Sequence, residues 1–114
     1  MSAITTHILD TATGKPGAGI PVVLERRSHN AGWQKIADGT TDGDGRVNDL
    51  LSPDNIFSEG HYRLSFELGP YFLLQGVECF FPQVNISFVV KDASQHYHVP
   101  LLMSPFGYST YRGS

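Results

Sequence analysis

The most constraining feature of the sequence is a succession of short apolar runs that alternate with polar residues, while helical periodicity is nearly absent. In the clearest run, residues 84–91, the apolar side chains Val84, Ile86, Phe88 and Val90 fall on one face of an extended strand. Many such runs between turn residues predict an all-β sandwich or barrel. The predicted strands cover residues 4–9, 20–27, 33–37, 47–50, 61–68, 84–91, 95–103 and 108–112.

Two kinds of segment separate these strands. Residues 28–32 are polar and predict a hairpin turn between the second and third strands. Residues 71–75 lack β-branched side chains and lie between Pro70 and Gly76, so they predict a short helix. No internal repeat or linker divides the chain, and its 114 residues predict a single domain over residues 1–114.

Composition excludes several classes of protein. Eight Lys and Arg against eleven Asp and Glu give a net charge of -3, which argues against nucleic acid as a partner. The single cysteine, Cys79, cannot form an intrachain disulfide and is predicted to be a packed thiol. The first residues have no basic start and no apolar run of signal-peptide length. We therefore expect no membrane segment and a cytoplasmic location.

A pair of histidines is the first candidate for chemistry. His96 and His98 are two residues apart, so in a strand both side chains project from the same face. Such a pair can bind a metal, act as acid and base, or lie unused on the surface. A structural zinc site needs four ligands, and His7 is the obvious third candidate, so we predict no metal site.

The segment Asp42 to Arg46, DGDGR, is similar to the start of a calcium loop but departs from it. The fifth position of an EF-hand loop supplies an oxygen ligand and the twelfth a glutamate, where this chain has Arg46 and Pro53. We interpret the segment as a tight turn whose glycines take positive φ. Such a turn presents the Arg46 guanidinium at the beginning of a strand.

Several motifs together resemble one known family. They are THILD at residues 6–10, DGR at 44–46, HYHVPLL at 96–102 and YRGS at 111–114, in the same order as in the transthyretin-like 5-hydroxyisourate hydrolases. The resemblance covers essentially the whole chain. It implies a sandwich of two four-stranded sheets with one short helix, assembled as a homotetramer, a dimer of dimers, with active sites in a channel between dimers.

The resemblance also implies an activity and a set of site residues. The activity is hydrolysis of the six-membered ring of 5-hydroxyisourate, a small molecule, without a cofactor. By resemblance the catalytic residues are His7, Arg46 and His98, and substrate contacts come from His7, Arg46, Tyr111, Arg112, Gly113, Ser114 and His96. Our hypothesis makes His98 the general base toward water and His7 a group that orients the substrate or relays a proton. Arg46 binds the substrate's carbonyl oxygens and the developing negative charge.

Two alternatives stay open. The same fold serves as a non-catalytic carrier of small hydrophobic ligands, because fold does not fix function. A structural β-sandwich is the other, although it has no need of two histidines and an arginine. The apolar residues 99–103, beside Phe106 and Tyr108, further predict an interface between copies of the chain.

Overall fold

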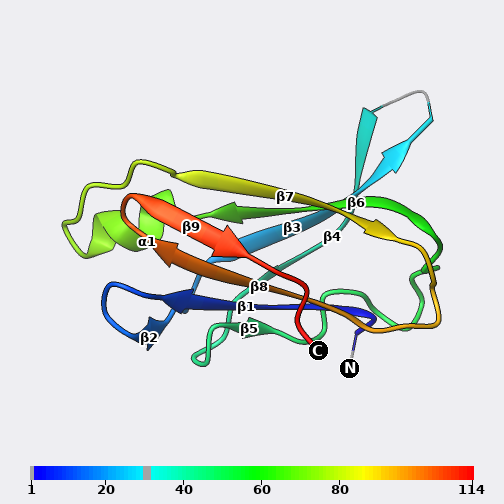
Figure 1. Ribbon diagram of the computed structural model, residues 1–114, viewed down its shortest axis with the longest axis horizontal. Coiled ribbons are helices and arrows are strands. Elements are labelled where there is room, and N and C mark those ends of the chain that lie inside the picture. Colours follow the sequence, from blue (N-terminus) through cyan, green and yellow to red (C-terminus); the bar gives the residue numbers. More distant parts are fainter. Residues whose placement is uncertain (1, 30–31) are drawn as a thin grey trace.

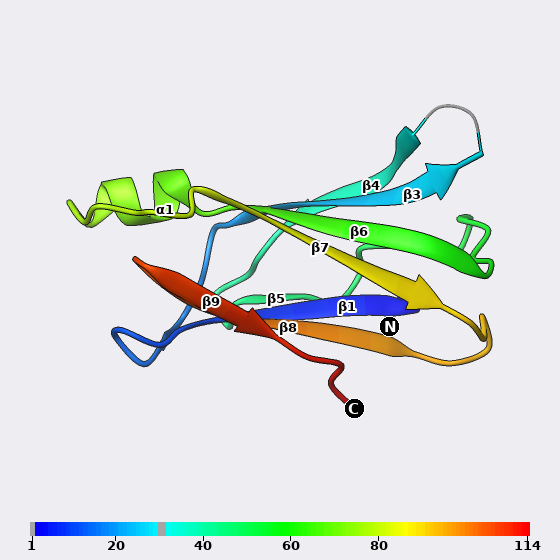
Figure 2. The ribbon, with the colours of Figure 1, turned by 45° about the horizontal axis from the view of Figure 1, so that its top comes forward.

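The alternating runs form two β-sheets that pack face to face (Figures 1 and 2). The computed structural model describes residues 2–29 and 32–114. The first sheet contains β1 (Ile4–Asp10), β2 (Lys15–Pro16), β5 (Arg46–Val47), β8 (Tyr97–Ser104) and β9 (Gly107–Thr110). The second contains β3 (Pro21–Ser28), β4 (Gly32–Thr40), β6 (Gly60–Glu67) and β7 (Gln83–Val90), in the order β4-β3-β6-β7.

The predicted all-β sandwich is confirmed, and one sheet is larger than expected. The first sheet has five strands instead of four, because the two-residue strands β2 and β5 both pair with β1. The strand predicted at residues 47–50 is limited to Arg46–Val47, where pairing with β1 ends. The predicted turn joins β3 to β4, but its residues 30 and 31 lie outside the described residues.

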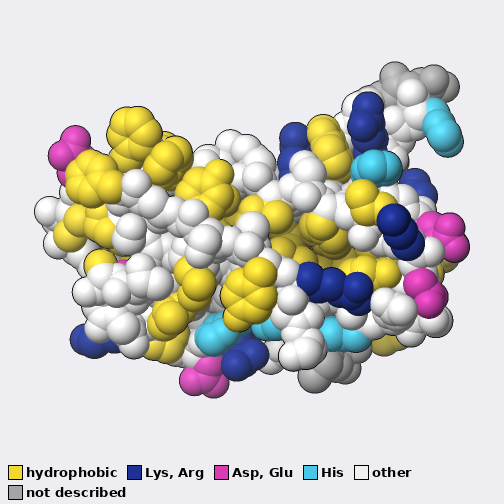
Figure 3. Space-filling view, viewed as in Figure 1, with side chains coloured by type: hydrophobic (Ala, Val, Ile, Leu, Met, Phe, Trp, Pro, Cys, Tyr) yellow, Lys and Arg dark blue, Asp and Glu magenta, His cyan; other side chains and the backbone are white. Residues whose placement is uncertain are grey.

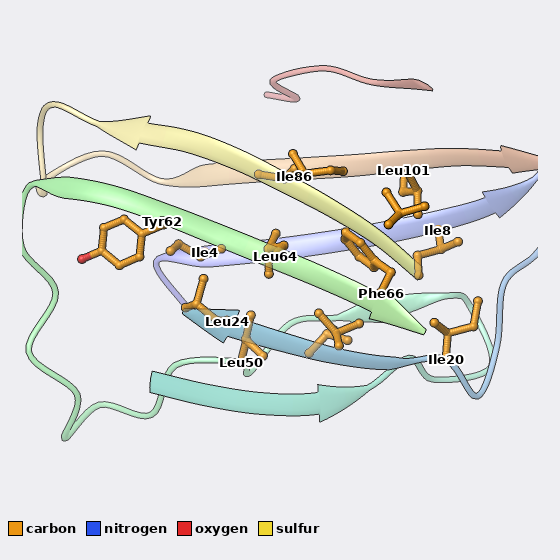
Figure 4. Close-up of a cluster of buried hydrophobic side chains, with 14 of the residues drawn as sticks. Ile4, Ile8, Ile20, Leu24, Leu50, Tyr62, Leu64, Phe66, Ile86 and Leu101 are labelled. Carbon is orange, nitrogen blue, oxygen red and sulfur yellow. The ribbon is translucent and has the colours of Figure 1, made fainter. Parts of the chain in front are cut away.

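The core lies between the two sheets, as the alternation of the strands requires (Figure 4). In β7, Val84, Ile86 and Val90 are buried and Phe88 is half-buried, which confirms the predicted apolar face. In β8, Val99, Leu101 and Met103 point into the same core. Residues 99–103 are thus largely buried within the domain. The apolar surface that remains exposed for the predicted interface between copies comes from neighbours such as Phe106 and Tyr108.

The short helix α1 (Gly69–Leu74) lies at one end of the sandwich (Figure 1). It begins two residues before the predicted helix, because Pro70 sits in the first turn, where no backbone N–H is needed. Phe72 packs into the core, whereas Leu73 and Leu74 are exposed. Cys79 follows in the next loop as a free, half-buried thiol packed against the core.

The pairing of β1 with β8 decides where the site forms. These strands run parallel, with Ile4 opposite Tyr97 and Asp10 opposite Met103, although about ninety residues separate them along the chain. The tail after β9 turns back past β8, so that both ends of the chain reach the same region (Figure 2). Among the described residues no helix is long and apolar enough to cross a membrane.

Candidate active site

Three predicted site residues meet on the outer face of the first sheet. The antiparallel pairing of β1 with β5 places His7 directly opposite Arg46, so their side chains share one face. The parallel pairing of β1 with β8 places Thr5 opposite His98, and Thr5 lies on the same face as His7. Segments far apart in the sequence therefore converge at β5, β1 and β8. Figure 3 shows histidine and Lys or Arg side chains close together along the lower part of one face.

The turn at residues 42–46 holds Arg46 in place. The Asp42 carboxylate accepts hydrogen bonds from the backbone N–H groups of Asp44 and Arg46, at 2.9 and 3.0 Å. The bond from the Arg46 backbone is the main cause that lowers the pKa of Asp42. Gly45 has a φ of 77°, and a Cβ there would lie 2.5 Å from the carbonyl oxygen of Ile8. The tight turn is confirmed, with positive φ at Gly45 and not at Gly43.

Thr5 connects the two histidines of the HYH segment. Its hydroxyl oxygen lies 2.9 Å from His96 Nε2 and 2.8 Å from His98 Nδ1. The two imidazoles thus reach the same atom, as expected from their spacing, although β8 begins only at Tyr97. Nε2 of His98 has no hydrogen-bond partner within residues 2–29 and 32–114. One nitrogen of the ring is anchored, and the other is available to a ligand.

The tail covers the His98 ring. The backbone N–H of Gly113 donates a 2.8 Å hydrogen bond to the carbonyl oxygen of His98. A Cβ at position 113 would lie 2.6 Å from Cδ2 of His98, so the close approach requires glycine. The next residue, Ser114, reaches the site itself. A pocket of about 170 Å³ is lined by Thr5, Arg46, Asn48, His96, His98 and Ser114.

The surroundings of His98 favour its neutral form. Burial lowers the pKa of His98 below its ordinary value of 6.5, and the positive charges of Arg46, His7 and His96 lower it further. An imidazole that is neutral near pH 7 accepts a proton readily. Arg46 forms no salt bridge with any described carboxylate, so its guanidinium keeps its positive charge for a ligand. The pocket thus combines a base with a cation.

Two predicted contact residues lie elsewhere in the single chain. Tyr111 and Arg112 line a separate, mainly apolar hollow of about 320 Å³ beside β7. The Arg112 guanidinium stacks over the ring of Tyr97 at 4.4 Å and donates a 2.9 Å hydrogen bond to Gln95 Oε1. These contacts order the tail, and a substrate-binding role for Tyr111 and Arg112 stays a prediction.

Two pocket residues were missed by the sequence reasoning. Thr5 has the same signal as the histidines, because it precedes His7 by two residues in a strand and so shares its face. Asn48 follows β5 and lines the pocket beside Arg46. Within the described part of the chain, no group of three or more His, Cys, Asp or Glu side chains is placed to bind a metal ion.

Comparison with known proteins identifies the family. Residues 4–113 match the model of the HIUase/Transthyretin family, and the chain belongs to this family. The 5-hydroxyisourate hydrolase of Salmonella dublin is 46% identical over 111 residues, which are 97% of this chain and 80% of the relative.

Two solved structures share the fold. The 5-hydroxyisourate hydrolase of Klebsiella pneumoniae has a TM-score of 0.83 and 37% identity, with 97% of this chain and 98% of that chain covered. Sea bream transthyretin in complex with thyroxine has a TM-score of 0.91 and 29% identity, with 98% and 95% covered. A hydrolase and a transthyretin whose structure contains thyroxine therefore share this architecture.

Proposed function

We propose that this protein hydrolyses 5-hydroxyisourate, in the breakdown of urate, to 2-oxo-4-hydroxy-4-carboxy-5-ureidoimidazoline. Family membership and the hydrolases among its relatives support the activity. The observation that carries the proposal is the convergence of His98 and Arg46 on one pocket, with His7 paired to Arg46 beside it. His98 as a base and Arg46 as a cation without a salt bridge to a described carboxylate supply two functions that hydrolysis of a ring amide needs, activation of water and stabilisation of the oxyanion.

The proposed reaction begins with a water molecule at Nε2 of His98. His98 takes a proton from this water while its oxygen forms a bond to the carbonyl carbon of the six-membered ring. Negative charge develops on the carbonyl oxygen, where the Arg46 guanidinium stabilises it. The ring C–N bond then breaks, and His98 gives the proton it took from water to the leaving nitrogen as the carboxylic acid forms and ionises. No cofactor enters these steps.

His7 is proposed to orient the substrate or to relay a proton. It lies opposite Arg46 on the same face and is half-buried, so it is placed at the edge of the pocket rather than inside it. The tail, through Gly113 and Ser114, is proposed to wall the site over His98. In this assignment His96 contacts the pocket from the side of Thr5.

The site is proposed to be completed by other copies of the chain in a homotetramer, a dimer of dimers. A pocket of about 170 Å³ is smaller than the roughly 300–1,000 Å³ typical of small-molecule sites, which supports a second wall from a neighbouring copy. Exposed aromatic side chains near the tail, Phe106, Tyr108 and Tyr111, supply apolar surface for such contacts. We also propose a cytoplasmic location, because a chain with one cysteine needs no oxidising compartment.

The alternative function is a carrier of small hydrophobic ligands. The similarity to sea bream transthyretin, whose structure contains thyroxine, favours this alternative. The pocket described above argues against it, because histidines, an arginine and hydroxyl groups line it rather than apolar side chains.

The two functions are separated by one assay. Urate oxidase generates 5-hydroxyisourate from urate, and its ultraviolet absorbance is followed with and without this protein. A hydrolase accelerates the decay well beyond the spontaneous rate, and His98→Asn lowers that acceleration by about 10²–10⁴-fold, the usual contribution of a general base. Decay at the spontaneous rate would favour the carrier.

A further inference from the structure

The buried hydroxyl of Thr5 lies between two imidazoles and makes one hydrogen bond to each. The partners are Nε2 of His96 at 2.9 Å and Nδ1 of His98 at 2.8 Å, and Thr5 is 2% exposed. A hydroxyl has a single proton, so it donates one hydrogen bond at most. The distribution of protons among Thr5, His96 and His98 is therefore restricted.

One distribution is costly. If Thr5 accepted hydrogen bonds from both rings, its own proton would have no partner among the described residues. An unpaired buried donor destabilises the protein, because it has lost its hydrogen bond to water and gained none in return. The favourable distributions are those in which Thr5 donates to one ring and accepts from the other.

The two remaining distributions place the proton of neutral His98 on different ring nitrogens. In the first, Nδ1–H of His98 donates to Thr5, and Thr5 donates to His96 Nε2. Nε2 of His98 then carries a lone pair. In the second, Nε2–H of His96 donates to Thr5, and Thr5 donates to His98 Nδ1. The proton of neutral His98 is then on Nε2, and the ring cannot accept a proton there.

We propose that Thr5 and His96 are positioning residues that hold neutral His98 with its proton on Nδ1 and its lone pair on Nε2, directed to the attacking water. This inference rests on the proposed function, because it assigns the orientation of the base in that reaction. In this assignment His96 is neutral with its own proton on Nδ1, so its Nε2 accepts the Thr5 proton and the first distribution forms. The Thr5 hydroxyl thereby couples the tautomer of His96 to the tautomer of His98.

The tautomer of His96 decides which distribution forms. A His96 ring that carries its proton on Nε2 donates to Thr5, and Thr5 then donates its own proton to His98 Nδ1. His98 is then in the tautomer that has no lone pair on Nε2. The charged groups that face this pair are His7 of β1, Arg46 of β5 and Arg112 of the tail, whose guanidinium lies 3.4 Å from the His96 carbonyl oxygen.

The direct test compares Thr5→Val with Thr5→Ser. Valine keeps the shape of threonine but has no hydroxyl, whereas serine keeps the hydroxyl. We expect Thr5→Val to lower kcat roughly 10- to 100-fold with little change in KM, as for other residues that orient a functional histidine. Thr5→Ser should retain most of the kcat. A kcat for Thr5→Val equal to that of the unmodified protein would overturn the proposal.

A spectroscopic readout separates this proposal from the proposed function. In ¹⁵N NMR spectra above neutral pH, the ring nitrogens of His98 should report the proton on Nδ1 in the unmodified protein and in Thr5→Ser. Thr5→Val should lose this preference. An unchanged His98 tautomer in Thr5→Val would overturn the role of Thr5, whereas failure to hydrolyse 5-hydroxyisourate would overturn the proposed function alone.

His96→Phe tests the second ring. Without the His96 imidazole, the Thr5 proton has no acceptor on that side, so the preference of His98 for a proton on Nδ1 should weaken in the ¹⁵N NMR spectra. The loss of kcat should be smaller than in Thr5→Val, since His98 can still donate to Thr5. A His98 tautomer in His96→Phe identical to that of the unmodified protein would contradict the positioning role of His96.

Discussion

The arginines on the outer faces of the two sheets differ in whether they are paired with a carboxylate. On the second sheet, Arg63 donates hydrogen bonds of 2.9 and 2.8 Å to one oxygen of Glu25 and stacks over Trp33 at 4.6 Å. On the first sheet, Arg46 has no salt bridge with a described carboxylate. The charge of Arg63 is thus paired within the fold, whereas the charge of Arg46 is available to a ligand.

The same contrast extends to neutral polar groups. On the second sheet, the Ser65 hydroxyl donates to Asn85 and the Gln83 amide donates to Glu67 across adjacent strands. In the pocket of the first sheet, Nε2 of His98 has no such partner among the residues described. The free Nε2 of His98 is therefore one of the features that favour a ligand site in the pocket of the first sheet.

Among the variants that test this contrast, the largest effect is expected from removing Arg46, which has no salt bridge with a described carboxylate. Arg46→Ala should lower kcat/KM by about 10²–10³-fold, the usual cost of losing one group that stabilises an oxyanion. Its free energy of unfolding should change by less than about 0.5 kcal/mol, because Arg46 is exposed and forms no salt bridge with a described residue. The ultraviolet assay and urea denaturation measure the two quantities. Near-normal turnover would remove Arg46 from the mechanism.

Displacing the tail should have an intermediate effect. The methyl group in Gly113→Ala would lie 2.6 Å from Cδ2 of His98, so either the tail or the ring must shift. We expect kcat to fall by up to about 10²-fold, as for other misplaced catalytic groups. Gly107→Ala is the matched control, because its nearest contact is an ordinary 3.7 Å to the Ser104 hydroxyl. Equal kcat values for the two variants would argue against a role of the tail.

Replacing Arg63, the arginine paired with Glu25, should lower stability and leave activity unchanged, the opposite of Arg46→Ala. Arg63→Ala removes a half-buried salt bridge and a stacking contact, so it should lower the free energy of unfolding by about 1 kcal/mol. Its kcat/KM should match that of the unmodified protein. A large loss of activity in Arg63→Ala without a loss of stability would contradict the proposed difference between the two arginines.

The smallest effect concerns the pKa of His98. Burial, followed by the charge of Arg46, lowers this pKa, so His98 should titrate below 6.5 and stay neutral at pH 7. Since the base must be unprotonated, kcat/KM should fall only as the pH decreases through this lowered pKa. Arg46→Ala should raise the midpoint toward 6.5. NMR titration of the His98 ring measures both values, and a midpoint at or above 6.5 in the unmodified protein would contradict the prediction.

Local patterns predicted much of the fold. The alternation in residues 84–91 gave the correct buried face of β7, and Asp42 to Arg46 gave the correct turn. Pairing between distant segments has no local signal. The strands β2 and β5 form because β1 offers them hydrogen bonds, and two residues are too few to show periodicity.

In the candidate site, too, local spacing predicted some features, whereas others depend on pairing between distant strands. The histidine spacing correctly placed His96 and His98 on one side of the chain, where both reach Thr5. The importance of Thr5 depends on the register of β1 against β8, which the sequence does not specify. Tyr111 and Arg112 share a short motif with Gly113, yet they line a different hollow, because the tail bends after β9.

The parallel pairing of β1 with β8 has a consequence for synthesis of the protein. A ribosome releases the N-terminal segment first, but the partner of that segment is translated more than ninety residues later. Until then β1 has an open edge on the side that β8 will occupy, and His98, the proposed base, has not been made. The nascent chain therefore cannot form the candidate pocket before β8 and the residues that follow β9 have been synthesised.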